Sequence, residues 1–334
     1  MAVKAAIDLG TSETRIYTKD GGIVLCEPTV TATDESKQKL TVKAIGNEAK
    51  KLIGKTAENT RIVFPVFEGE IVNEKLCADM LDGFLNKIKF NKGFSGSLLF
   101  SVPCGAENTL LKKINKVASK LGISQTYFIE APICSAIGQN IPLSESSPCF
   151  VIDMGGGVTN IAGLSLDGVI AGVSVGLGGK NIDVWLIDYI ADRYSLQIGL
   201  LTAERIKIQM GSLYENDTLS TVVNGRDLTT GRPRSIVLKA EDIITPIKKY
   251  YDKIFEIATA VLSKFPPEVS AEIRHSGVYV SGGTASIVGL EDYYSKKFGM
   301  QINVSEEPQT CVALGLGNLI NNPALMKRVM INEE

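Results

Sequence analysis

Two short stretches of the chain place a carboxylate directly before a turn of small residues. The apolar run AAID ends at Asp8 and leads into LGTS, and the run VID ends at Asp153 and leads into MGGG. Glycines let backbone N–H groups approach phosphate oxygens, and such turns bind anions without a cationic side chain. An acid beside each turn can hold Mg²⁺ through its water shell. Two such turns facing each other predict a clamp for a nucleotide triphosphate.

The two stretches belong to an internal repeat of about twenty residues. AAIDLGTSETRIYTKDGGIV, from Ala5, aligns with VIDMGGGVTNIAGLSLDGVI, from Val151, when Asp8 is set on Asp153. Each copy predicts a strand, a polar turn, a second strand and a closing turn. One such hairpin is common, but two with an acid at the same place indicate two related halves.

A third glycine turn follows later in the chain. GVYVSGGTASIVGLEDYYSKKF, from Gly277, predicts a strand ending at Ser281, a turn over Gly282 to Ala285, and an amphipathic helix. A glycine pair at a strand-to-helix turn lets a base or ribose lie close to the backbone. As the third of three such turns, it favours an adenosine-binding role.

Composition and charge exclude several classes of protein. With 334 residues, two cores joined through a cleft are expected. A net charge of −2 gives no general attraction to nucleic acid, and one histidine leaves almost no material for a Ser-His-Asp triad. The first residues enter strand-like sequence with no apolar signal core, and no apolar run approaches the roughly 20 residues of a membrane span. A cytoplasmic protein with buried, unpaired cysteines is therefore predicted.

Nine segments together resemble the MreB family of bacterial actin-like proteins, in order and spacing, from about Ile7 to about Leu319. They are AIDLGT, GIVLCEPTV, VPCGAE, VIDMGGG, GLGGKNID, TAERIKIQMGS, GRDLTTGRP, SGGTA and TCVALGLGN. The resemblance implies an actin and Hsp70 ATPase fold, with two duplicated α/β domains around a nucleotide cleft, each with a small inserted subdomain. It also implies ATP or ADP with Mg²⁺ as cofactors, and membrane-associated double protofilaments that contribute to cell shape.

The resemblance also assigns residues to the nucleotide site. Asp8 and Asp153 would hold Mg²⁺, through water. Glu204 and Lys207, one helical turn apart, match a pair that contacts ribose and base, although the same spacing also suits a surface ion pair. The remaining positions implied to bind nucleotide are Gly10, Thr11, Ser12 and Glu13 in the first turn, Gly155, Gly156 and Gly157 in the second, and Gly282, Gly283, Thr284 and Ala285 in the third.

Two departures from the family pattern remove polar groups near the attacking water. The family usually reads I-E-E-P and GGGTT, whereas this chain reads IEAP and GGGVT, which places Ala131 and Val158 at those positions. A methyl and an isopropyl group cannot accept a proton, and positioned acid–base help contributes about 10²- to 10⁴-fold in rate. Weak or absent hydrolysis is predicted. Glu130 is the alternative base, but adjacent residues on an element point in different directions.

Two further departures change the charge beside the phosphates. Glu13 stands where the family has asparagine, so a negative charge is expected there unless Mg²⁺ or a lysine offsets it. Lys180 stands where the family commonly has an acid and is a candidate for that lysine.

Attachment to the inner membrane surface rests mainly on one segment, and the C-terminal PALMKRVMINEE is a weaker candidate of the same kind. NKIKFNKGFSG alternates Ile88, Phe90 and Phe94 with lysines, a pattern that suits an anionic lipid surface. The alternative is that Ile88 and Phe90 complete the apolar face of the preceding helix. The other usual device, an N-terminal amphipathic helix, is not expected because strand sequence begins by Val3.

Three functions remain open: a filament subunit, a sugar or acid kinase of the same superfamily, and an Hsp70-like ATPase. The first is favoured, with self-association, possible paralogous actin-like subunits and no nucleic acid as partners. Domain I is expected over residues 1–140 and 310–334, with an insertion at about 27–73. Domain II is expected over 141–309, with an insertion at about 180–245. The longest apolar-periodic segment, 241–265, predicts a core helix.

Overall fold

The first half of the chain forms a five-stranded mixed sheet. The computed structural model describes residues 3–34, 41–91, 96–143 and 147–331. Within it β1 pairs parallel with β9 and antiparallel with β2. Alternate residues of β1 enter different cores, because Ala5 and Ile7 pack on one face of the sheet and Ala6 on the other. The strands, in sheet order, are β10 (Gln125–Glu130), β9 (Ser97–Val102), β1 (Ala5–Leu9), β2 (Glu13–Thr18) and β3 (Gly22–Pro28).

The second half repeats this sheet. Its strands run in the same order from the parallel edge, with two parallel pairings followed by two antiparallel ones. Both copies carry a shift in register between their last two strands, at Ile16/Tyr17 and at Gly163/Leu164. The predicted duplication is confirmed. The strands are β18 (Ile302–Val304), β17 (Val278–Ser281), β11 (Cys149–Met154), β12 (Thr159–Ser165) and β13 (Gly168–Val175).

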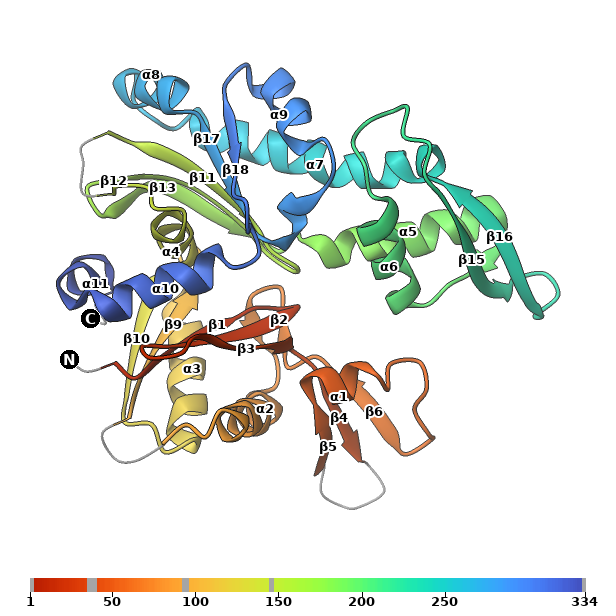
Figure 1. Ribbon diagram of the computed structural model, residues 1–334, viewed down its shortest axis with the longest axis horizontal. Helices are drawn as coiled ribbons and strands as arrows, with labels where there is room; N and C mark the ends of the chain where they lie inside the picture. The colour runs from red at the N-terminus through yellow and green to blue at the C-terminus, as the bar shows by residue number, and fades with distance from the viewer. Residues whose placement is uncertain (1–2, 35–40, 92–95, 144–146, 332–334) are drawn as a thin grey trace.

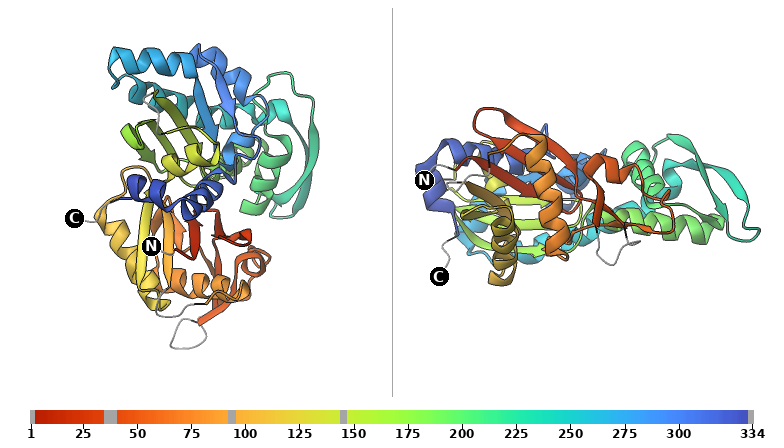
Figure 2. Two further views of the ribbon diagram at one scale, coloured as in Figure 1. Left: turned by 60° about the vertical axis from the view of Figure 1, so that its left-hand side comes forward. Right: turned by 90° about the horizontal axis from the view of Figure 1, so that it is seen from below.

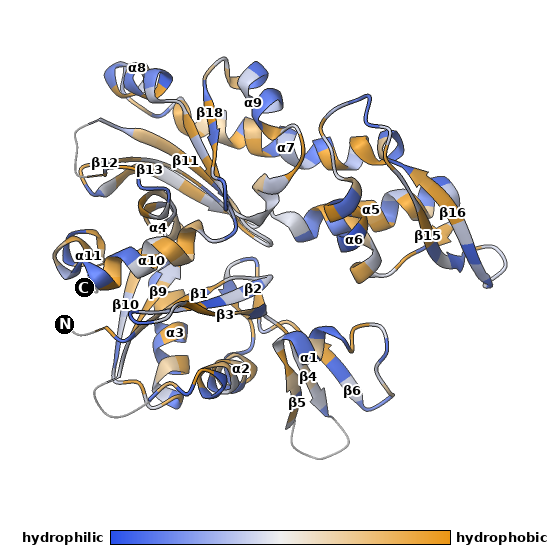
Figure 3. Ribbon diagram, viewed as in Figure 1, coloured by the Kyte–Doolittle hydropathy of each residue, from blue (hydrophilic) through white to orange (hydrophobic). Residues whose placement is uncertain are grey.

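Helices cover both faces of the two sheets (Figure 1). The expected core helix is α7 (Ala240–Leu262); its Tyr250 and Tyr251 are fully buried with Tyr294 of α9 (Leu290–Phe298). Figure 3 shows apolar colour concentrated on the central strands and on the helix surfaces that meet them. The other helices on the large sheets are α2 (Glu74–Lys87), α3 (Asn108–Lys120), α4 (Ala131–Gly138), α8 (Pro267–Ser276), α10 (Cys311–Asn321) and α11 (Pro323–Val329).

Helices α4 and α10 join the two halves. They contribute to one core with strands of both sheets, and the C-terminal helices lie between the halves in the left view of Figure 2. Two glycines bring their backbones together: a Cβ on Gly315 would lie 1.8 Å from the Cys134 carbonyl oxygen, and one on Gly138 would lie 1.9 Å from that of Cys311. The C-terminal helices thus pack against both sheets, and the assignment of the C-terminal helix to the first domain stays a prediction.

Two small sheets extend from the same side of the molecule, away from the termini (Figure 1). They fall within the two expected insertions; the residue limits given for the domains stay predictions. In the described residues no helix is long and apolar enough to cross a membrane. The first small sheet has β5 (Thr41–Ile45), β4 (Thr31–Asp34) and β6 (Thr60–Val63) with α1 (Gly46–Lys50), followed by the hairpin β7 (Val66–Phe67) and β8 (Glu70–Ile71). The second has β14 (Leu196–Gln197), β15 (Ser220–Asp227) and β16 (Pro233–Lys239) beside α5 (Gly179–Tyr194) and α6 (Leu200–Met210).

Five of the six cysteines are buried, as expected, but Cys26 on β3 is exposed. The strand alternates its side chains between core and solvent, and Cys26 falls on the solvent side next to buried Leu25.

Candidate functional site: a cleft between the two halves

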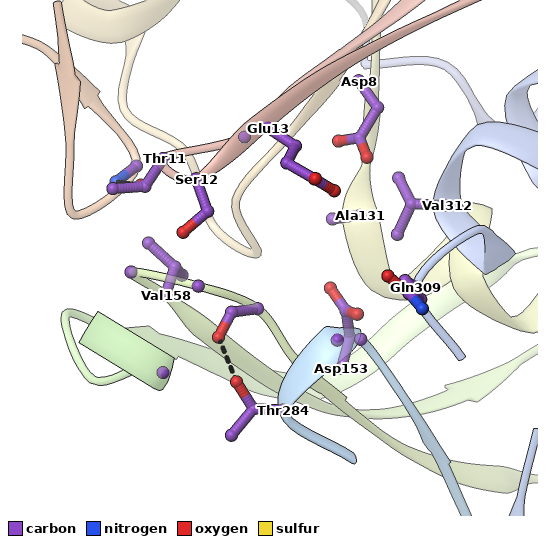
Figure 4. Close-up of a pocket in the computed structure, with 18 of the residues that line it drawn as sticks. Asp8, Thr11, Ser12, Glu13, Ala131, Asp153, Val158, Thr284, Gln309 and Val312 are labelled. Atoms are coloured by element: carbon purple, nitrogen blue, oxygen red, sulfur yellow. Dashed lines mark hydrogen bonds between the residues drawn. The ribbon is translucent and has the colours of Figure 1, made fainter. Parts of the chain in front are cut away.

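The three glycine turns meet in one cavity of about 360 Å³ between the two halves. Lys50 and Gln309 also line it, from α1 and from the loop before α10. Figure 4 shows side chains of both halves facing this cavity. Of the predicted nucleotide-site residues, those that line it are Asp8, Gly10, Thr11, Ser12, Glu13, Asp153, Gly155, Gly156, Gly157, Glu204, Lys207, Gly282, Gly283 and Thr284. Ala285 instead is buried in the core of the second half.

The first two glycine turns, at Gly10 and at Gly155, are the predicted phosphate-binding turns, called the phosphate turns below, and they have the same hydrogen bond. The Gly10 N–H donates to the Glu13 carbonyl at 3.1 Å, and the Gly155 N–H donates to that of Val158 at 2.8 Å. The turns also touch each other, because a Cβ on Gly156 would lie 2.0 Å from the Ser12 Oγ. A side chain at Gly156 would therefore clash with Ser12 of the other turn.

Each acid lies at the end of a central strand and accepts hydrogen bonds from neighbours. The Ser101 hydroxyl donates to Asp8 at 2.9 Å, and the Ser281 hydroxyl and the Asn160 amide donate to Asp153 at 3.0 and 3.2 Å. Burial raises the pKa of Asp8. Burial, with the negative charge of Asp8, raises the pKa of Asp153 to about 6.

These two carboxylates fit a bound magnesium ion. Asp8 and Asp153 face the same space in Figure 4, and the negative charge of Asp8 disfavours the ionised form of Asp153. A divalent cation between them would relieve this repulsion, and Mg²⁺ accepts carboxylate and phosphate oxygens around a partial water shell. The carboxylates of Asp8 and Asp153 therefore suit Mg²⁺, the ion predicted from the sequence.

The third turn is held against the second phosphate turn. Gly282 has φ +84°, and a Cβ there would lie 2.2 Å from the Met154 carbonyl oxygen. The Thr284 hydroxyl donates to the Gly155 carbonyl at 2.8 Å, the dashed contact in Figure 4. The buried Tyr251 hydroxyl donates to the Thr284 carbonyl at 2.8 Å. The strand-to-helix turn thus presents its backbone to the cavity.

Glu204 and Lys207, both on α6, line the cavity but bond to different partners. Glu204 pairs with Lys50 of the first half at 2.9 Å. Lys207 pairs with Asp183 at 2.8 Å and donates to the Gly179 carbonyl at 2.8 Å. The two residues do not form the surface ion pair with each other that their spacing allows; they connect α6 to opposite walls of the cleft.

Comparison with known proteins identifies the family. A sequence model described as MreB/Mbl protein matches residues 2–328. The chain belongs to the MreB/Mbl family. It is 35% identical to the cell shape-determining protein MreB of Escherichia coli (strain K12) over 320 residues, which cover 94% of this chain and 92% of that protein. It is 33% identical to the cell shape-determining protein Mbl of Bacillus subtilis (strain 168) over 318 residues, with 95% of each chain covered.

Solved structures confirm the actin-like fold. MreB5 of Spiroplasma citri bound to ADP has a TM-score of 0.89 and 27% identity, covering 94% of this chain and 95% of that one. The same protein bound to AMPPNP has a TM-score of 0.91 and 26% identity, covering 97% of each chain. A MamK double helical filament, at 19% identity and a TM-score of 0.79, shares the fold.

In this MreB/Mbl chain the two apolar replacements lie at the cavity wall. Ala131, the first residue of α4, and Val158, in the second phosphate turn, both line the cavity. Glu130 is not among the lining residues. Its Oε1 accepts a hydrogen bond from the Gly105 N–H at 2.5 Å. The Glu130 side chain therefore points toward the loop at Gly105 and not into the cavity. This agrees with the expectation that adjacent residues point in different directions.

The cation beside Glu13 is Arg15, which the sequence reasoning missed. The Arg15 guanidinium forms an ion pair with the Glu13 carboxylate, and both side chains line the cavity. Lys180 does not have the expected role; its ammonium donates to the Thr11 carbonyl at 2.7 Å. The signal for Arg15 was available, since residues two apart on a strand share a face.

The membrane candidates are only partly described. Ile88 and Phe90 are half-buried and pack against the core of the first half, beyond the end of α2. Phe94 lies outside the described residues. The packing of the first two side chains favours the alternative reading, and a lipid contact here stays a prediction.

Proposed function

We propose that this chain is an ATP-binding subunit of a membrane-associated actin-like filament that contributes to cell shape. The observation that carries the proposal is the convergence of three glycine turns and two buried carboxylates in one cleft between duplicated halves. The relative from Spiroplasma citri, at 26–27% identity over nearly the whole chain, was crystallised with ADP and with AMPPNP. In this proposal the paired turns bind the phosphates, Asp8 and Asp153 hold Mg²⁺, and the turn at Gly282 receives the adenosine.

We further propose that hydrolysis is weak. Phosphoryl transfer to water depends on holding the water in line and removing its proton. The two residues at the proposed water position, Ala131 and Val158, present only carbon atoms. Glu130 would have to give up its hydrogen bond to Gly105 to reach the cleft. Nucleotide binding rather than turnover would then control the state of the filament.

Family membership supports the assembly and the location that we propose. Self-association into double protofilaments, with paralogous actin-like subunits as possible partners, and a cytoplasmic position at the inner face of the membrane are part of the proposal. The proposed membrane contact is the segment from Asn86 to Gly96, whose Ile88 and Phe90 also pack against the core of the first half. A kinase or chaperone function is not favoured by any feature of the described residues.

The test is phosphate release from purified protein with Mg-ATP, with filament sedimentation from the same samples. Filaments with little phosphate are expected, and Ala131→Glu combined with Val158→Thr should raise release about 10²-fold or more. Glu130→Ala is the matched control and should change neither reading. Phosphate release from the unmodified chain as fast as from the Ala131→Glu, Val158→Thr variant would refute the catalytic assignment, and failure to sediment would refute filament formation.

A further inference from the structure

The duplicated halves differ in the residue that faces each cleft acid. Asp8 on β1 lies opposite Arg15 on β2, and Asp153 on β11 lies opposite Asn160 on β12. Each partner is seven residues after its acid, so Arg15 and Asn160 occupy the same place in the repeat. Both line the cavity. The second half therefore presents a neutral amide where the first half presents a permanent cation.

The neutral partner has its hydrogen bonds satisfied. The Asn160 amide donates to Asp153 at 3.2 Å, and its oxygen accepts from the Cys104 N–H at 3.0 Å. This side chain therefore holds the acid and a nearby loop. It has no charge to offer a ligand.

Within the part of the chain that the structure describes, the Arg15 guanidinium is hydrogen-bonded through only one of its terminal nitrogens. Nη2 of Arg15 pairs with Glu13, whereas Nη1 lies 3.9 Å from the Asp8 carboxylate, beyond hydrogen-bond distance. Its Nε is buried and has no hydrogen-bond partner among the described residues. The side chain is 11% exposed. A buried donor without a partner is costly, so an acceptor within the cleft would stabilise it.

The chemistry of arginine selects the acceptor. A guanidinium keeps its charge at any physiological pH, and its planar set of N–H groups matches the oxygens of phosphate. It also offsets the charge of the surrounding acids, because the positive charge of Arg15 acts to lower the pKa of both Asp8 and Asp153. Mg²⁺ would perform the same task at this place.

We propose that Arg15 is a fixed cation at the phosphate end of the cleft, which lets this chain bind adenine nucleotide with reduced dependence on Mg²⁺. The inference rests on the proposed nucleotide site and deepens it. Glu13 opposes the effect, because it engages one side of the guanidinium. Removing the Glu13 charge should therefore release Arg15 toward the phosphates, and removing Arg15 should make the site depend on the metal.

The experiment measures the Kd of ADP and of ATP by titration calorimetry, at constant ionic strength, with excess Mg²⁺ or with EDTA. The quantity of interest is the ratio of Kd in EDTA to Kd in Mg²⁺. Because Arg15 would be the cation that remains beside the phosphates in EDTA, this ratio should be at least about tenfold larger for Arg15→Met than for the unmodified chain, the size expected for the loss of one hydrogen bond to a charged group. Arg15→Lys, which keeps the charge, should fall between them.

Two further variants make the result specific. Glu13→Gln should lower the ratio, the opposite direction, and it carries the test if Arg15→Met does not fold. Arg232→Met, at an exposed position between β15 and β16, is the matched control and should leave the ratio unchanged. Equal ratios for all proteins would overturn the role of Arg15 while leaving the nucleotide site intact. No nucleotide binding in either solution would overturn the proposed function and this inference with it.

Discussion

Lys180 connects the two halves of the cleft, and its ionisation should make the free energy of unfolding depend on pH. The ammonium group donates to the Thr11 carbonyl at 2.7 Å and lies 4.4 Å from the centre of the Phe64 ring. Burial lowers the pKa of Lys180 to about 8, although the carboxylates of Glu204 and Asp183 act in the opposite direction. The folded protein therefore holds this proton less tightly than the unfolded chain does.

The sign and size of the effect follow from proton linkage. An unfolded lysine keeps its ordinary pKa of 10.5. Between the two pKa values the unfolded chain binds more protons, so the free energy of unfolding rises with pH through that window. Integrating from about pH 7 to about pH 9 gives a gain of about 1.4 kcal/mol from Lys180 alone, an order-of-magnitude figure.

The assay is urea denaturation of nucleotide-free protein at both pH values, for the unmodified chain and for Lys180→Met. Other groups titrate in both proteins, so the difference between them isolates Lys180. The stability of the unmodified chain relative to the variant should rise by about 1.4 kcal/mol between the two pH values. Lys112→Met, an exposed lysine on α3, is the control and should show no such change. A relative stability of Lys180→Met that does not change with pH would refute the reasoning.

Three substitutions test the turn at Gly282, the contact between α4 and α10, and the role of Glu130. Gly282→Ala should lower the free energy of unfolding, measured by urea denaturation, by about 1–3 kcal/mol and should weaken ADP binding, because φ is +84° and the Met154 carbonyl occupies the place of the new methyl group. Unchanged binding would contradict the adenosine assignment. Gly315→Ala should lower the free energy of unfolding by about 1–3 kcal/mol, since the new methyl group would clash with the Cys134 carbonyl. An unchanged melting temperature would count against the contact between α4 and α10. Glu130→Gln should leave phosphate release unchanged, and a fall of about 10²-fold would identify it as the base.

Local sequence was enough to predict the three turns and the duplication. An acid at the end of an apolar strand, followed by small residues, specifies a turn within a few positions of the chain. Two such segments specify two halves. The lining of one cavity by Asp8, Asp153 and Gly282 could therefore be predicted before any long-range contact was known. The actin-like fold was implied by the resemblance to the MreB family.

Pairings between distant segments were not predictable in the same way. Lys180 bonds to Thr11, and Lys50 to Glu204, across more than 150 positions of the chain, and no local pattern indicates such contacts. Arg15 is different, because its place on the same strand face as Glu13 follows from alternation alone. The glycine pattern of the repeat does not by itself indicate which residues lie opposite its acids.

The contacts across the cleft explain why nucleotide binding alone could fix the position of one half relative to the other. The phosphate turns touch at Gly156 and Ser12, Lys180 bonds to the opposite turn, and Lys50 bonds to Glu204. A nucleotide that contacts both turns contacts both halves at once. A ligand shifts a conformational equilibrium only if its binding free energy differs between the two conformations. Hydrolysis would remove part of those contacts. A chain that hydrolyses slowly would keep them, so nucleotide exchange and subunit contacts would govern how long the halves stay together.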